Sequence, residues 1–167
     1  MLHIPILRHG QPYESVDHVT LVHHATGEPI ARVSQANSGM LSRDIGRMDD
    51  RALEGLSMHE LIAIARRAAS LFMEAELPVG DQPQSFDDYV RQLSATTGMP
   101  VSYCRGNAQK IRRVLDEIEL VLAGLTRGLD LDVLDRGYGL RDGHMLSFYR
   151  GGRVFGAVLP RDRKSVG

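Results

Sequence analysis

The sequence predicts an α+β fold that is mainly helical, with one β-hairpin near the amino terminus and another near the carboxyl terminus. Apolar residues recur with helical spacing in three stretches between residues 57 and 125. Towards both ends of the chain, β-rich stretches flank turn-forming glycines. With 167 residues and 43% hydrophobic content, the chain is long enough for one domain with a core. We expect one segment over residues 1–160 and a charged, non-native-looking tail at 161–167.

Composition and charge exclude several classes of protein. The net charge of −1 provides no long-range attraction to nucleic acid or to an anionic membrane. No apolar run approaches the roughly 18 residues that a membrane-spanning helix needs, and the first residues lack the pattern of a signal peptide. Cys104 is the only cysteine, so an intramolecular disulfide is impossible, which fits a reducing compartment. We expect a cytoplasmic protein without a nucleic-acid or membrane partner.

The first apolar run, residues 2–8, predicts a short edge strand, because Pro5 excludes a central one. The motif Arg8–Gln11 that follows resembles the opening of the histidine phosphatases. In that family the histidine, here His9, accepts the phosphoryl group, and the arginine, here Arg8, holds the phosphate. The family pattern continues into a helix, whereas a hairpin is predicted here. The alternative is a simple turn into the next strand.

Residues 18–34 predict a β-hairpin, with strands at 18–23 and 29–34 and a turn at Ala25–Glu28. The adjacent pair His23 and His24 suggests a metal site. Neighbouring residues on a strand point to opposite faces, however, so we do not expect both to hold one ion. A loop and a short helix around Leu41 to Met48 should follow.

Two helices are predicted in the middle of the chain. Ser57 and Glu60 form a capping box that opens a helix over 57–76. Residues 78–84 are linker-like, since they contain two prolines and a glycine. A second helix covers 85–97, and the short connection after it predicts packing against the next helix.

A long helix is predicted between Pro100 and Gly128, followed by a loop over 128–139. Seven apolar residues share one of its faces: Ile111, Val114, Leu115, Ile118, Val121, Leu122 and Leu125. We expect this face to be the core of the chain, enclosed by the helices at 57–76 and 85–97.

Two chemical interpretations of this region are weak. Cys104 lies near the start of the long helix beside Arg105, where a thiol pKa can be lowered, but the sequence identifies no general base for it. A small buried hydrophobe is the alternative. Asp130, Asp132 and Asp135 suggest calcium, but their spacing does not match the calcium-binding loop of EF-hands. A solvated, cap-forming loop is the alternative for them.

The end of the chain predicts two strands, at 145–150 and 153–159, joined by Gly151–Gly152. The second strand is apolar along most of its length, as a strand buried on both faces is. A strand of this kind needs parallel neighbours and a crossover helix. The sequence therefore looks like the start of an α/β domain at its carboxyl end.

Several segments together resemble the aldehyde dehydrogenase superfamily, in a branch related to acyl-CoA reductases. Ala25–Glu28 resembles an "NPATGE" segment that this superfamily often carries in an amino-terminal hairpin. Arg153–Pro160 looks like the first strand of its nucleotide-binding domain. The further resembling segments are Gly27–Ile30, Val33–Asn37, Arg105–Asn107, Leu125–Leu131, Val133–Gly139 and Gly156–Pro160.

The resemblance implies an NAD- or NADP-dependent parent oxidoreductase that acts on a small aldehyde or acyl substrate and is a homo-oligomer. In the family, a cysteine of a later domain attacks the carbonyl, and an asparagine amide stabilises the oxyanion. The matching place for that amide here is Asp162, whose carboxylate would repel an oxyanion. We therefore expect a truncated amino-terminal portion that is inactive alone, with no catalytic, cofactor-binding or metal residue assigned. A small phosphatase using His9 and a non-catalytic helical partner-binding module are the alternatives.

Overall fold

The structure is a computed structural model that describes residues 1–49, 51 and 53–147. Within these residues the chain is an α+β fold of six helices and nine short strands. The predicted strand at 153–159, Asp162 and the tail at 161–167 lie outside this range. The strands are β1 (Leu2–Ile4), β2 (Ile6–Arg8), β3 (Gln11–Tyr13), β4 (His18–Val22), β5 (Pro29–Ser34), β6 (Leu77–Val79), β7 (Gln82–Gln84), β8 (Tyr138–Arg141) and β9 (His144–Ser147). The helices are α1 (Ser38–Ile45), α2 (Met58–Glu74), α3 (Phe86–Thr97), α4 (Val101–Asp116), α5 (Ile118–Leu125) and α6 (Asp132–Arg136).

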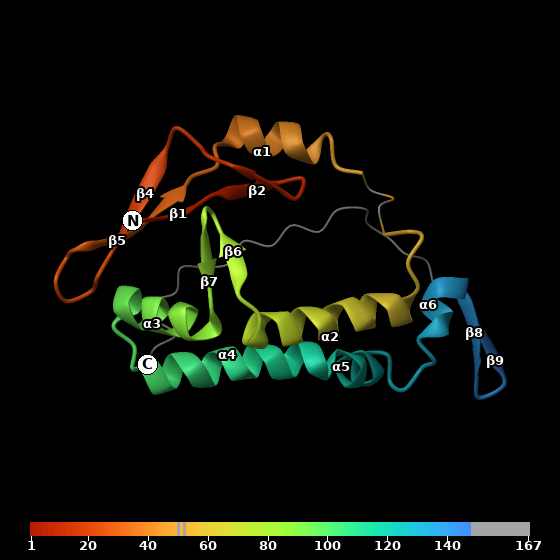
Figure 1. Cartoon of the computed structure of the whole chain (residues 1–167). Helices are drawn as coiled ribbons and strands as arrows, with labels where there is room; N and C mark the ends of the chain where they lie inside the picture. The colour runs from red at the N-terminus through yellow and green to blue at the C-terminus, as the bar shows by residue number, and fades with distance from the viewer. Residues whose placement is uncertain (50, 52, 148–167) are drawn as a thin grey trace.

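The amino-terminal part forms a three-stranded sheet in the order β1-β5-β4 (Figure 1). The predicted hairpin is confirmed, because β4 and β5 pair antiparallel with His18 opposite Ser34. Gly27 takes a φ of 73° in the connecting turn. β1 adds in parallel to the other side of β5, with Leu2 opposite Ala31, so it is the edge strand that Pro5 predicts.

Pro5 also divides the predicted strand 2–8 into two. β2 leaves the first sheet and pairs antiparallel with β3. The turn between them holds His9 and Gly10 at positive φ, 49° and 78° respectively. A proline lacks the N–H that a continuous ladder requires, which explains the change of partner at this point.

Helices α2, α3, α4 and α5 pack against one another in a second layer, in which α2 lies along α4 and α5, whereas α1 lies near the amino-terminal strands (Figure 1). The predicted capping box is present at Ser57 in front of α2, and a second capping box, at Ser85, precedes α3. Ala69, Val90 and Cys104, from α2, α3 and α4, are all 0% exposed. These three residues mark the centre of the helical core, and the predicted packing of α3 on α4 is confirmed.

The apolar face predicted as the core is largely exposed, which corrects the sequence-based expectation. Ile111, Val114, Val121 and Leu125 are exposed, the last by 76%, and the other three members of the face are only partly buried. The long helix also breaks at Glu117, whose φ and ψ are −95° and 15°. α4 instead packs through the small side chains of Cys104 and Ala108. Small side chains permit close approach of the helices. The surface of α4 that neighbouring helices cover is therefore narrower than the predicted apolar face.

Two local predictions are also corrected, and a third is confirmed over its described residues. The linker at 78–84 belongs to an antiparallel hairpin of β6 and β7. The loop at 128–139 contains α6 and the first residues of β8. The described part of the strand predicted at 145–150 is β9, which pairs with β8. Asp142 and Gly143 form the turn between them, with φ of 50° and 78°, the conformation that favours Asp-Gly in two-residue hairpins.

The short helix predicted around Leu41 to Met48 begins earlier, at Ser38. Asn37 caps it, because its side-chain oxygen accepts a hydrogen bond of 2.8 Å from the backbone N–H of Met40. The helix ends at Ile45, in front of Gly46. The capping asparagine therefore fixes the start of α1 three residues before the first residue of the predicted helix.

Candidate functional site

The arginine of the phosphatase-like motif is occupied by a carboxylate. Arg8 donates two hydrogen bonds to Asp44, from Nε at 2.7 Å and from Nη2 at 2.6 Å. Its guanidinium also lies over the ring of Tyr13, 4.7 Å from the centroid. Nε2 of His9 lies 3.8 Å from the same carboxylate. A phosphate at this position would meet the negative charge of Asp44, so the geometry gives no support to a phosphatase.

The adjacent histidines, His23 and His24, stabilise the turn between β4 and β5. Their rings do not point to opposite faces but stack, with centroids 5.0 Å apart, because both residues follow the end of β4. Nδ1 of His23 accepts hydrogen bonds from the backbone N–H groups of Ala25 and Thr26. His24 lies within hydrogen-bonding distance of the Ala95 carbonyl through its backbone N–H, at 2.8 Å, and through Nδ1, at 3.1 Å. The pair thus shapes the turn and attaches it to the last turn of α3.

Cys104 is fully buried at the centre of the helical core. Its Sγ lies 3.9 Å from the carbonyl oxygen of Met99. Arg105 points elsewhere, since it pairs with Asp87 at 2.7 Å and lies over the ring of Phe86. A thiol without solvent access and without a nearby cation behaves as a small hydrophobe.

The three aspartates after α5 are engaged in local contacts. Asp130 accepts a hydrogen bond from the backbone N–H of Asp132 and pairs with Arg136. Asp132 lies 3.4 Å from Nδ1 of His59. The carboxylate of Asp135 accepts from the backbone N–H of Met58, at the start of α2. The carboxylates therefore stabilise the turn and the start of α2, as the cap-forming alternative predicts.

Sequence reasoning missed one cluster, which the three-stranded sheet brings together. His3 on β1, Glu14 before β4 and His18 on β4 each place one ligand-type atom within 4.8 Å of the other two. The register explains the two histidines: His3 lies beside Arg32 of β5, and His18 lies opposite Ser34. Positions 32 and 34 of a strand share one face, so both imidazoles lie over that face of the sheet.

The surroundings of the cluster hold its members in place. Nε2 of His3 lies 2.9 Å from Oγ of Ser34, a buried hydroxyl that also accepts the Ser15 backbone N–H. Nη2 of Arg32 pairs with Oε1 of Glu14 at 2.6 Å. The rings of His3 and His18 meet edge to face, with centroids 5.7 Å apart. An open cavity of about 510 Å³ adjoins the cluster and is lined in part by His3, Glu14 and Arg32.

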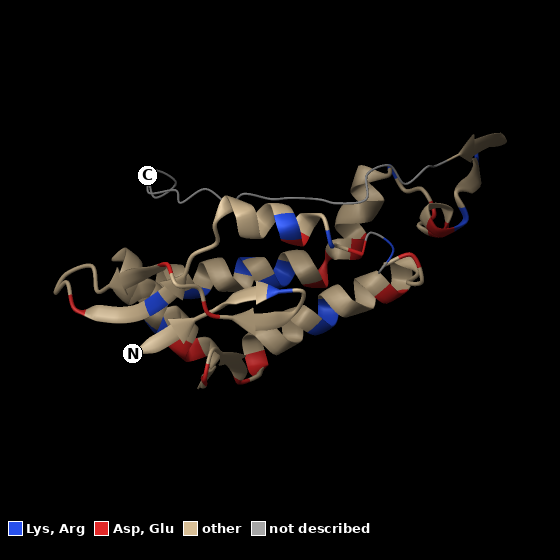
Figure 2. Ribbon diagram, turned by 90° about the horizontal axis from the view of Figure 1, so that it is seen from above, with Lys and Arg blue, Asp and Glu red and all other residues tan. Residues whose placement is uncertain are grey.

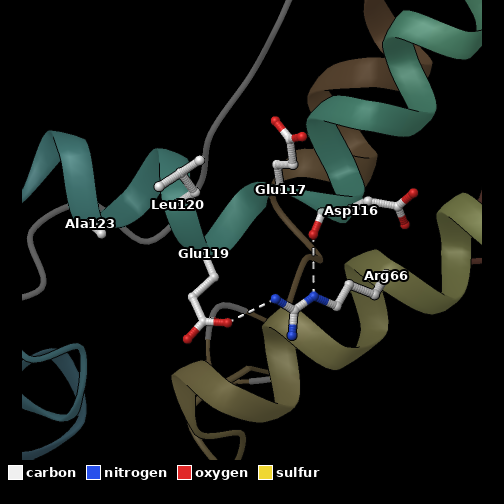
Figure 3. A pocket seen from close by; sticks show the side chains of 6 residues that line it. All are labelled: Arg66, Asp116, Glu117, Glu119, Leu120 and Ala123. Atoms are coloured by element: carbon white, nitrogen blue, oxygen red, sulfur yellow. Dashed lines mark hydrogen bonds and ion pairs between the residues drawn. The ribbon is translucent and has the colours of Figure 1, made fainter.

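A second, shallow depression of about 410 Å³ lies at the break between α4 and α5 (Figure 3). Arg66 of α2 reaches across it and donates from Nε to the Asp116 carbonyl, at 3.2 Å, and from Nη2 to Glu119, at 2.8 Å. Asp116 is the last residue of α4, where a carbonyl lacks an intrahelical partner. Arg66 therefore ties both sides of the break to α2, and we assign the depression a structural role.

Along the ribbon of Figure 2, the positions of Lys and Arg lie among those of Asp and Glu in the described chain. Many of them form ion pairs, such as Arg113 with Glu117 and Arg112 with Asp116. Among the residues that the structure describes, no helix combines the length and the apolar content that crossing a membrane requires. The mixed charges and the ion pairs give no support to a nucleic-acid surface.

Comparison of the sequence with protein-family models and with curated proteins finds no match. Assignments of function therefore depend on the residues themselves.

Proposed function

We propose that this chain is the amino-terminal, non-catalytic portion of an NAD- or NADP-dependent oxidoreductase similar to aldehyde dehydrogenases and acyl-CoA reductases. The resemblance of the segments around 25–37 and 125–139 is the observation that carries the proposal. The parent enzyme would bind the dinucleotide and a small aldehyde or acyl substrate in later domains. The chain itself would contribute structure and no reacting group.

The folded positions of these segments support the proposal. Ala25–Glu28 lies in the turn of an amino-terminal hairpin, where the resemblance places it. The segment after α5 is a packed unit, because Leu129, Leu131 and Val133 are buried. A Cβ at Gly139 would lie 2.2 Å from Cγ2 of Val133, so a larger residue there would require the buried Val133 side chain to move. A segment with such constraints serves as a structural element.

The exposed apolar stripe on α4 and α5 is a further support. Ile111, Val114, Val121 and Leu125, all members of the predicted apolar face, are more than 40% exposed. Apolar residues gathered on one surface are normally covered by another part of a protein or by a partner. A cofactor domain of the same polypeptide would provide such a cover. The same stripe is also the observation that favours the second candidate, a non-catalytic helical module that binds a separate partner protein.

The proposal is tested by expressing the continuous reading frame that contains this chain and by assaying NAD- and NADP-linked oxidation of aldehydes and reduction of acyl-CoA. We expect activity in a longer product that carries a nucleotide-binding domain and a cysteine nucleophile, and none in residues 1–160 alone. A reading frame without such a domain would remove the family assignment. Turnover by the isolated chain that disappears in Cys104→Ser would remove the non-catalytic role.

A further inference from the structure

We propose that His3, Glu14 and His18 form a binding site for a divalent transition-metal ion, with Zn²⁺ as the preferred occupant. This inference does not depend on the proposed oxidoreductase, because it concerns only the amino-terminal sheet. One ligand-type atom from each side chain lies within 4.8 Å of the other two. Bonds of about 2.0–2.2 Å place the ligands of a zinc ion roughly 3–4 Å apart. Small rotations of the side chains would therefore bring the three atoms onto one ion.

His18 provides an independent reason to expect a ligand. Its Nε2 is buried and makes no hydrogen bond to any residue in the described parts of the chain. The nearest carboxylate oxygen, Oε1 of Glu14, lies 3.5 Å away. Buried polar atoms of folded proteins are rarely left without a partner. A metal ion that accepts the lone pair of a neutral imidazole would satisfy this nitrogen.

Neighbouring side chains hold the other two groups in place. Nε2 of His3 lies 2.9 Å from the buried Oγ of Ser34. A hydrogen bond at one ring nitrogen typically fixes the ring of a ligating histidine. Glu14 is held by Arg32, but its carboxylate offers about four lone-pair positions, so the ion pair leaves it able to coordinate.

The donor set selects the class of ion. Two imidazoles and one carboxylate suit Zn²⁺ and related transition metals, whereas Mg²⁺ and Ca²⁺ prefer oxygen ligands. Three protein ligands leave a fourth position for water, and the adjoining cavity is lined by two of these residues, His3 and Glu14. Bound there, the ion would join β1, the segment before β4, and β4 across the sheet. We therefore expect it to stabilise the fold.

The first experiment titrates the full chain, stripped of metals, with Zn²⁺ in a calorimeter. We expect one ion per chain with micromolar or tighter affinity, and a melting temperature raised by about 5 °C or more when free Zn²⁺ is roughly 100 times Kd. Glu14→Gln and His3→Ala should each weaken binding at least tenfold. His59→Ala is the matched control, since His59 also lies beside a carboxylate, Asp132 at 3.4 Å, and it should bind like the unaltered chain.

A second measurement avoids variants whose fold could be lost. His18 is mostly covered, whereas the Glu14 side chain is 55% exposed, so Glu14→Gln should keep its circular dichroism spectrum. In the unaltered chain, one equivalent of Zn²⁺ should shift the imidazole NMR signals of His3 and His18. The proposal is overturned if no Zn²⁺ binds at micromolar concentrations, if Glu14→Gln binds as tightly as the unaltered chain, or if the ring signals of other histidines shift instead.

Discussion

Gly80 lies at the tip of the β6–β7 hairpin, where it approaches the backbone of β1. A Cβ at this position would lie 2.1 Å from the carbonyl oxygen of His3, and its φ is 63°. We expect Gly80→Ala to destabilise the chain by about 2–4 kcal/mol, because strain and a clash with backbone add. Gly106→Ala is the control: it lies within α4 with no atom near its Cβ and should be neutral or stabilising. Chemical denaturation measures the free energy of unfolding of both variants. Equal values for Gly80→Ala and Gly106→Ala would contradict the predicted clash.

His9 should not accept a phosphoryl group. The Arg8 guanidinium beside it is held by both oxygens of Asp44, whose charge opposes an incoming phosphate. Incubation with acetyl phosphate or phosphoramidate should leave the mass of the chain unchanged. Acid-labile phosphate that is present in the unaltered chain and absent from His9→Ala would restore the phosphatase as a candidate.

Three carboxylates make stability depend on acid pH. The hydrogen bonds from Arg8 lower the pKa of Asp44 below 3.8. The backbone N–H of its N-cap serine lowers the pKa of Glu60 below 4.5, and the hydroxyl of another N-cap serine lowers that of Asp88 below 3.8. At acid pH the unfolded chain therefore binds more protons than the folded chain. The contributions of these carboxylates to stability are present above pH 4.5, the ordinary pKa of Glu60. They are lost as the pH falls through the lowered pKa values of the folded chain.

Thermal unfolding followed by circular dichroism should show this loss. We expect the melting temperature to fall progressively below about pH 4.5. The combined variant Asp44→Asn, Glu60→Gln and Asp88→Asn should be less stable at neutral pH and should lose less on acidification. If the melting temperatures of the unaltered chain and of the triple variant fall equally on acidification, other groups cause the acid sensitivity.

Among the secondary-structure elements, α2, α3 and α4 carry the helical core, whereas α5 carries exposed apolar residues. Val90 is 0% exposed and Leu125 is 76% exposed. Val90→Ala should therefore cost about 2 kcal/mol, through two lost methyl groups and the cavity that they leave. Leu125→Ala should change stability by less than about 0.5 kcal/mol. Urea unfolding of the two variants makes the comparison, and the reverse order of effects would place the core on the predicted face.

The elements that sequence predicts well are those with local signals. Ser57, Ser85 and Gly27 sit at positions whose hydrogen bonds or dihedral angles involve only near neighbours, and all three are where they were predicted. Asp142–Gly143 carries an equally local turn signal, since both residues take positive φ. The break between α4 and α5 at Glu117 contains neither proline nor glycine, so no local residue predicts it.

The cluster of His3, Glu14 and His18 could not be predicted in the same way. It depends on the parallel pairing of β1 with β5, residues about 29 positions apart, as Leu2 lies opposite Ala31. Such a pairing is set by the packing of the whole sheet, and a three-residue strand carries no pattern that selects its partner. The two histidines could be placed on one face only after the register was known.

For the molecule as a whole, the exposed apolar stripe should promote self-association. The isolated chain should sediment as larger species when its concentration rises, because contact between two stripes removes apolar surface from water. The double variant Val121→Glu and Leu125→Glu should shift the distribution to the monomer. Both positions are exposed, at 41% and 76%, so the substitutions should not disturb the fold. An unaltered chain that remains monomeric at all concentrations would contradict this expectation.

The attachment of the hairpin turn to α3 has a consequence for how the chain opens. His24 bonds to the carbonyl of Ala95, and a Cβ at Gly98 would lie 2.9 Å from the His24 ring, so the turn and the helix end fit closely. At another point of the sheet, Gly80 contacts β1. Two such attachments prevent the sheet from swinging away as a rigid flap. Amide protons of β5 and of α3 should therefore exchange with solvent in one shared opening event, which makes sheet and helices a single cooperative unit.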